Sequence, residues 1–175
     1  AKEGYLFPDT YFFLATDDEV DVIASLADNF EKKIEPLRPE IVATGKTEKN
    51  IIIMASIIEK EAKGEKDRGY ISGILWKRLE EGVPLQIDAT VNYVRGRSDH
   101  SVTIKDTEID SLYNTYKYYG LPKGPISNPG LESIMATIYP TASEYWYYLS
   151  DQDTGKTIFS KTLEEHIENR AKYLG

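Results

Sequence analysis

The chain contains no cysteine and only two histidines, His100 and His166. The first absence excludes disulfide bonds, thiolate zinc sites and cysteine nucleophiles, and two histidines so far apart do not indicate a metal site. No apolar run approaches the roughly 18 residues that a membrane-spanning helix needs. Acidic residues outnumber basic ones by 29 to 21, so the formal charge is −8 and no nucleic-acid-binding surface is expected.

The chain is long enough, at 175 residues, for a single domain with a hydrophobic core. We expect residues 1–175 to be one excised domain, whose membrane anchor would lie upstream. Tyrosine is unusually frequent, with 13 residues. A tyrosine ring has an apolar face and a polar edge, which suits both a ligand such as a sugar and an aromatic core.

The first half of the chain has the apolar spacing of α-helices. A capping box of Thr16 and Glu19 predicts a helix that ends near Ile34, before Pro36 and Pro39. A second helix is expected from Thr47 to Lys63, and a third from Asp67 to Glu81. Residues 85–95 fit a strand or a short helix, because Pro84 and the β-branched residues leave both open.

The second half mixes loops with shorter elements. Asn128 and Pro129 are predicted as the cap and first position of a helix that runs to Ile138. Strands 145–149 and 156–159 flank Asp153-Thr154-Gly155, a strong hairpin signal. Thr162 and Glu165 predict a capping box for a last helix to about Tyr173. The expected fold class is therefore α+β, mainly helical, with a C-terminal β-hairpin and short strands.

One acidic residue falls on an apolar helix face. At about 100° per residue, Glu61 projects between Ile57, Ile58 and Met54, whereas Glu59 points away and faces Lys63 four residues on. Burial among apolar side chains raises the pKa of a carboxyl, and a carboxyl that stays protonated near neutral pH can act as a general acid. The alternative is that Glu61 ends the helix in solvent, where it has no catalytic role.

Other candidates are weaker. Asp88 could be the second carboxylate of a glycosidase, although its position favours a cap for a short helix starting at Ala89. No nucleophile elbow, phosphate-binding loop or dinucleotide fingerprint is present in the sequence.

Five segments in order resemble the endolytic murein transglycosylases, the MltG or YceG-like family. They are Glu3–Tyr11, Ala55–Glu61, Leu85–Val91, Tyr113–Tyr116 and Gly120–Ile126. The resemblance implies a lysozyme-like catalytic domain that needs no cofactor and no metal. Its substrate would be nascent peptidoglycan, cleaved at the β-1,4 bond between N-acetylmuramic acid and N-acetylglucosamine to leave a 1,6-anhydromuramyl end.

The same resemblance places the family's catalytic glutamate on Glu61, with Glu59 as the fallback. Sugar contacts are expected from polar side chains of the matching segments, namely Gln86, Asp88, Tyr113, Asn114 and Tyr116. Bracing the long glycine- and proline-rich loop is the alternative role for these residues. The resemblance also implies a location at the extracytoplasmic face of the bacterial membrane, with cell-wall synthesis proteins as further partners.

Two other functions remain open at this point. A muramidase would use the same Glu61 but admit water, held by Asp88, in place of the sugar's own C6 hydroxyl. A non-catalytic peptidoglycan-binding module would keep the tyrosines but would not need an acid on an apolar face.

Overall fold

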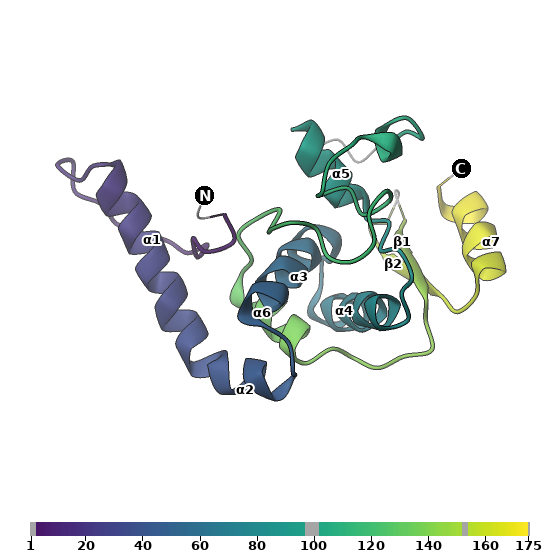
Figure 1. Cartoon of the computed structure of the whole chain (residues 1–175), viewed down its shortest axis with the longest axis horizontal. Coiled ribbons are helices and arrows are strands. Elements are labelled where there is room, and N and C mark those ends of the chain that lie inside the picture. The colour runs from purple at the N-terminus through teal and green to yellow at the C-terminus, as the bar shows by residue number, and fades with distance from the viewer. Residues whose placement is uncertain (1–2, 97–101, 152–153, 175) are drawn as a thin grey trace.

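The computed structural model describes residues 3–96, 102–151 and 154–174. Helices dominate this part of the chain, and a two-stranded antiparallel sheet lies near the C-terminus, before the last helix (Figure 1). The fold class is therefore α+β, as predicted. No helix of the described residues is both long enough and apolar enough to cross a membrane.

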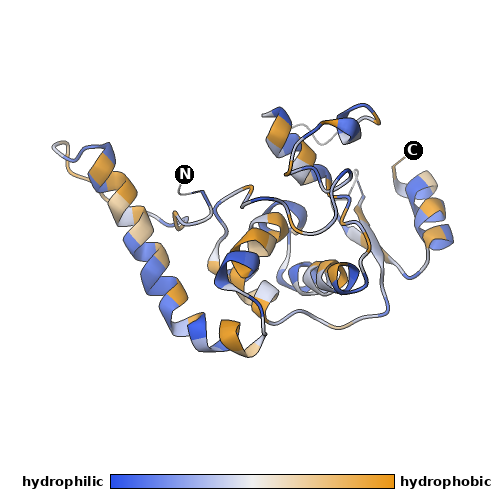
Figure 2. Ribbon diagram, viewed as in Figure 1, coloured by the Kyte–Doolittle hydropathy of each residue, from blue (hydrophilic) through white to orange (hydrophobic). Residues whose placement is uncertain are grey.

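Helix α3 (Glu48–Glu61) forms the centre of the fold. Every residue from Ile51 to Ile58 is buried, so this helix is covered on all sides. Helices α4 (Glu65–Glu80) and α6 (Leu131–Ile138) pack against it, and the apolar residues gather in this central group (Figure 2). The indole N–H of Trp76 donates to the Thr137 carbonyl at 3.1 Å, which fixes α4 against α6. Helix α3 ends two residues earlier than predicted, at Glu61.

Helix α1 (Glu19–Ile34) extends along one side of this group as an arm (Figure 1). The predicted cap is wrong by two residues: Asp18 accepts from the Val20 and Asp21 amides, and Asp21 completes the capping box. Only Phe30 and Ile34, near the end of the helix, are buried. A short 3-10 turn, η1 (Glu35–Leu37), and helix α2 (Arg38–Ala43) connect α1 to α3.

The segment that was open between strand and helix is helical. Helix α5 (Asp88–Arg95) is capped by Ile87, so Asp88 is its first residue and not its cap. The long region that follows contains one 3-10 turn among the described residues, η2 (Asp106–Glu108).

The predicted cap of α6 is also wrong. The helix starts at Leu131 with Gly130 as its cap residue. Asn128 instead turns its side chain to the start of the chain, where its Oδ1 accepts from the amides of Gly4 at 2.7 Å and Leu6 at 3.3 Å. The N-terminal segment is thereby held against the loop that leads into α6.

The hairpin and the last helix are confirmed. Strands β1 (Tyr147–Ser150) and β2 (Thr157–Ser160) pair antiparallel, with Tyr148 opposite Phe159. Asp153 of the predicted turn lies outside the described residues. Helix α7 (Leu163–Tyr173) begins at the predicted cap, because the Thr162 hydroxyl accepts from the Glu165 amide.

Candidate active site

Glu61 is the last residue of α3, has intermediate exposure and lies where β1 and α5 meet this helix. Tyr148 of β1 donates its hydroxyl hydrogen to Glu61 Oε2 at 2.9 Å. The backbone amide of Ala89, in the first turn of α5, also favours the ionised form of the carboxyl. The acid is therefore held from two sides by groups that arrive from distant parts of the sequence.

The pKa of Glu61 is raised from its ordinary value of 4.5 to about 7. Burial is the largest cause, and the negative charge of Asp88 raises the pKa further, while the Tyr148 and Ala89 donors oppose the rise. The carboxyl end of a helix also disfavours a negative charge at that position. A raised pKa agrees with the sequence argument, although the like charge comes from Asp88 and not from Glu65.

Asp88 lies beside the acid and is itself exposed. The Tyr116 hydroxyl donates to Asp88 Oδ1 at 2.5 Å. Burial and this hydrogen bond raise the pKa of Tyr116, so Tyr116 remains a neutral donor. Two of the predicted sugar-contact residues, Asp88 and Tyr116, are thus brought next to Glu61.

The other three predicted contact residues have different surroundings. Gln86 is exposed, and its Oε1 accepts from Arg78 at 3.3 Å. Tyr113 packs its ring on Tyr93, with the ring centroids 4.9 Å apart. Asn114 is buried, and its side-chain amide donates to the carbonyls of Thr107 and Ile109. Asn114 therefore braces the segment around η2, and we do not include it among the proposed substrate contacts.

Glu59 is not part of a solvent-side ion pair with Lys63. Its Oε2 accepts from the Gly130 amide at 3.1 Å and from the Ser133 hydroxyl at 2.6 Å. Both donors belong to the start of α6, so Glu59 supplies the carboxylate that a helix N-terminus favours. The two glutamates of α3 are therefore separated in role by their surroundings.

Sequence reasoning missed two residues of the site, Tyr148 and Arg78. Tyr148 is one tyrosine of 13, and only its pairing in β1 aims it at Glu61. Arg78 had a signal that could have found it, because it lies seven residues after Ile71 and four after Ile74 on the inward face of α4. Its exposed fraction is 7%.

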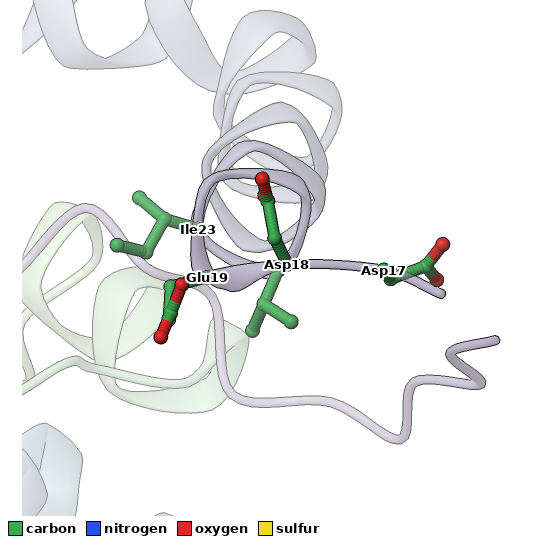
Figure 3. A pocket seen from close by; sticks show the side chains of 5 residues that line it. Asp17, Asp18, Glu19 and Ile23 are labelled. Carbon is green, nitrogen blue, oxygen red and sulfur yellow. The ribbon is translucent and has the colours of Figure 1, made fainter. Parts of the chain in front are cut away.

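The other features of the part of the chain that the structure describes suggest no second site of this kind. Among the described residues no group of three histidine, aspartate or glutamate side chains could hold a metal ion. His166 stacks on Tyr147, with centroids 5.1 Å apart, and His100 lies outside the described residues. The hollow in Figure 3 lies at the start of α1, and the carboxylate of its Asp18 is used by the helix cap.

The fold and the site together define a mainly helical α+β domain that carries one acid able to hold a proton near neutral pH. The chain belongs to the YceG-like family, whose model matches residues 1–172. The crystal structure of a YceG-like protein from Listeria monocytogenes superposes with a TM-score of 0.91 at 43% identity, covering 96% of this chain and 55% of that one.

Two curated relatives carry the name endolytic murein transglycosylase. The protein from Bacillus subtilis (strain 168) is 39% identical over 173 residues, which are 98% of this chain and 48% of that protein. The protein from Streptococcus pneumoniae serotype 2 is 32% identical over 177 residues, which are 98% of this chain and 32% of that protein. The chain thus spans half or less of the length of these relatives.

Proposed function

We propose that this chain is the catalytic domain of an endolytic peptidoglycan transglycosylase, with Glu61 as its catalytic residue. The observation that carries the proposal is a partly exposed glutamate whose pKa is raised to about 7 and whose carboxyl is held by Tyr148. The names of the two relatives support the substrate class, glycan strands of peptidoglycan.

In this mechanism Glu61 acts twice. The protonated carboxyl donates its proton to the glycosidic oxygen as positive charge develops at the muramyl anomeric carbon. The carboxylate that results takes the proton from the C6 hydroxyl of the same sugar, and that oxygen closes on the anomeric carbon to give the 1,6-anhydro end. An intramolecular nucleophile of this kind gains a large effective concentration from correct positioning.

The neighbouring side chains have defined tasks in the proposal. The Tyr148 hydroxyl stabilises the carboxylate after the first proton transfer, because a hydrogen bond to a charged acceptor is stronger than one to a neutral acceptor. Asp88 carries a negative charge beside the developing positive charge, and Tyr116 holds Asp88 in place. Gln86 and Tyr113 complete the proposed sugar contacts.

The wider setting is also proposed, because the chain covers only part of its relatives. We place the lysozyme-like catalytic domain, residues 1–175, at the extracytoplasmic face of the bacterial membrane, anchored by residues outside this chain. Cell-wall synthesis proteins would be its partners there.

A muramidase is the second candidate, and one observation favours it: Asp88 is exposed next to the acid, where it could hold a water molecule. Mass spectrometry of the products from purified glycan strands separates the two reactions. Anhydromuramyl ends are one water lighter than reducing ends, and reducing muramyl ends alone would refute the transglycosylase.

The catalytic role itself is tested by Glu61→Gln. This change removes the proton but keeps the shape of the side chain, so cleavage is expected to fall by about 100- to 10,000-fold while glycan binding persists. Unchanged cleavage would exclude Glu61. A wild-type protein that binds strands without cutting them, with the upstream region restored, would support the non-catalytic binding module instead.

A further inference from the structure

Arg78 of α4 is a buried cation without a carboxylate partner among the described residues. Its Nη2 donates to the Pro84 carbonyl at 2.7 Å and to Gln86 Oε1 at 3.3 Å. Its Nη1 reaches the Trp146 carbonyl at 3.5 Å, and its Nε has no hydrogen-bond partner. The guanidinium also lies over the Tyr147 ring, 5.5 Å from its centroid. Burying a charge that is balanced by carbonyl and amide dipoles and one aromatic ring, with no carboxylate, is costly, so the position calls for a physical reason.

The contacts of Arg78 join the two segments that supply the partners of Glu61. Trp146 lies two residues before Tyr148, which donates to the acid. Gln86 lies three residues before Ala89, whose amide also acts on the acid. One guanidinium group therefore connects the approach to β1 with the approach to α5.

The second of these segments has an unusual backbone. Gln86 is the only described residue other than glycine with a positive φ, 53°. Such a conformation persists only where the surroundings hold it, and here the Gln86 amide donates to the Thr115 carbonyl while its side chain accepts from Arg78.

We propose that Arg78 is a positioning residue of the active site, which fixes Tyr148 and the start of α5 at the correct distance from Glu61. This role rests on the proposed function. The planar guanidinium suits the task, because it presents several donors in a fixed geometry to acceptors in different directions. Its positive charge also opposes the rise in the pKa of Tyr148, which makes that hydroxyl a stronger donor to the carboxylate.

The experiment is the substitution Arg78→Lys, which keeps the charge but cannot reach both segments. The pKa of Glu61 is measured by NMR on chain with ¹³C-labelled glutamate carboxyls, with no substrate present. If the two donors lose their alignment, the pKa of Glu61 rises by about one unit. With glycan strands, kcat falls by about 100-fold because the alignment of the acid is lost. KM rises by a smaller factor, because Arg78 also holds Gln86, one of the proposed sugar contacts.

Arg68→Lys is the matched control, since Arg68 lies on the same helix and pairs with Glu132 on α6. It is expected to change stability without moving the pKa of Glu61. In a double-mutant cycle, the combined pKa shift of Arg78→Lys and Tyr148→Phe should be smaller than the sum of the single shifts.

The proposal is overturned if Arg78→Lys keeps the wild-type pKa of Glu61 and the wild-type kcat. It is also overturned if the pKa shifts of Arg78→Lys and Tyr148→Phe add fully in the double variant. If Arg78→Lys does not fold, Arg78→Gln is measured in its place. Failure of both to fold would show that Arg78 serves the core and not the site. The NMR titration needs no turnover, so a chain that cleaves no glycan refutes the proposed function and leaves this test intact.

Discussion

Glu59 and Glu61 are two residues apart on α3, and two helical residues turn a side chain through about 200°. That rotation places Glu59 at the start of α6, where two donors satisfy it, and Glu61 at the junction of β1 and α5. Burial and the charge of Asp88 raise the pKa of Glu61. The direction of the side chain therefore decides which carboxyl can deliver a proton.

The pH dependence of cleavage follows from this pKa. Glu61 must be protonated to act as the acid, and its pKa is about 7. We expect kcat/KM on soluble glycan strands to persist up to about pH 7 and to fall about tenfold per unit above it. A carboxyl with the ordinary value of 4.5 would already lose activity above pH 5, and that profile would contradict the assignment.

The same pKa affects stability with a defined sign. A carboxyl whose pKa is higher in the folded state binds more protons there, so its stabilising contribution is complete below pH 4.5 and is lost as the pH rises through about 7. Glu61→Gln has no ionisable group at this position, so this loss of stability at high pH does not occur in the variant. Relative to the wild type, the variant should gain about 1 to 3 kcal/mol in free energy of unfolding between pH 4 and pH 8. Urea titrations of both proteins at pH 4 and pH 8 measure the gain. The same difference in free energy of unfolding between variant and wild type at the two pH values would contradict the prediction.

Tyr148→Phe tests the hydrogen bond to the acid. Loss of a donor to a charged acceptor is worth about 1.5 to 3 kcal/mol, so the pKa of Glu61 should rise by about one to two units. The fall in kcat/KM would then move to higher pH, with a lower maximum rate. Tyr147→Phe is the control, because the neighbouring Tyr147 ring faces His166 and no described group bonds its hydroxyl. Equal pH profiles of kcat/KM for Tyr148→Phe and Tyr147→Phe would refute a role for Tyr148.

At the scale of elements, α6 depends on a side chain of α3 for its N-terminal cap. Gly130, the cap residue, has no side chain to offer, and Glu59 accepts from its amide and from Ser133. The central pair of helices is therefore joined by a polar contact at one end as well as by the buried core.

Glu59→Ala should lower the free energy of unfolding by about 1 to 3 kcal/mol, because it leaves the Gly130 amide and the Ser133 hydroxyl without their acceptor. Denaturant titration gives the magnitude. In Glu59→Ala the pH profile of cleavage should keep its shape, including the decline above pH 7. Absence of that decline in the variant would identify Glu59 as the acid.

Local patterns predicted the elements whose determinants are local. The apolar run of α3, the turn signal of the hairpin and the Thr162 cap are each contained in a few neighbouring residues, and all three elements are confirmed. The cap of α1 failed because Thr16 with Glu19 and Asp18 with Asp21 are both acceptable boxes. The cap of α6 failed because Asn128 bonds the other end of the chain, which no local pattern reveals.

The features of the candidate site also fall into those that local patterns predicted and those that depend on distant contacts. The helix face predicted the direction of the pKa shift of Glu61, and the helix face together with the family resemblance selected Glu61 over Glu59. The contact of Tyr148 with Glu61 spans 87 residues and that of Arg78 with Trp146 spans 68. The positive φ of Gln86 is held by Thr115 and Arg78. None of these tertiary contacts could be derived from spacing.

At the scale of the whole molecule, the N-terminal segment is held by a residue far along the chain. Asn128 accepts from the amide of Gly4, 124 residues away, and from that of Leu6, 122 residues away. Closing so long a loop costs entropy before the contact stabilises anything, so this contact is expected to form late in folding.

Asn128→Ala should lower the free energy of unfolding by about 1 to 3 kcal/mol, mainly through faster unfolding. Stopped-flow chevron plots separate the two rates. Asn169→Ala is the control, because Asn169 bonds Ser160 only nine residues away. Slower folding in proportion to the lost stability would show that the N-terminal segment docks early.

The raised pKa of Glu61 also decides which inhibitors would suit the site. Cleavage needs the neutral acid, whereas a ligand with a fixed positive charge at the anomeric position is attracted by the ionised carboxylate. Ionisation of Glu61 occurs around pH 7, so the affinity of such a ligand should increase as the pH rises through the range in which cleavage declines. Cationic sugar analogues selected for this domain are therefore best screened above neutral pH, and neutral ones below it.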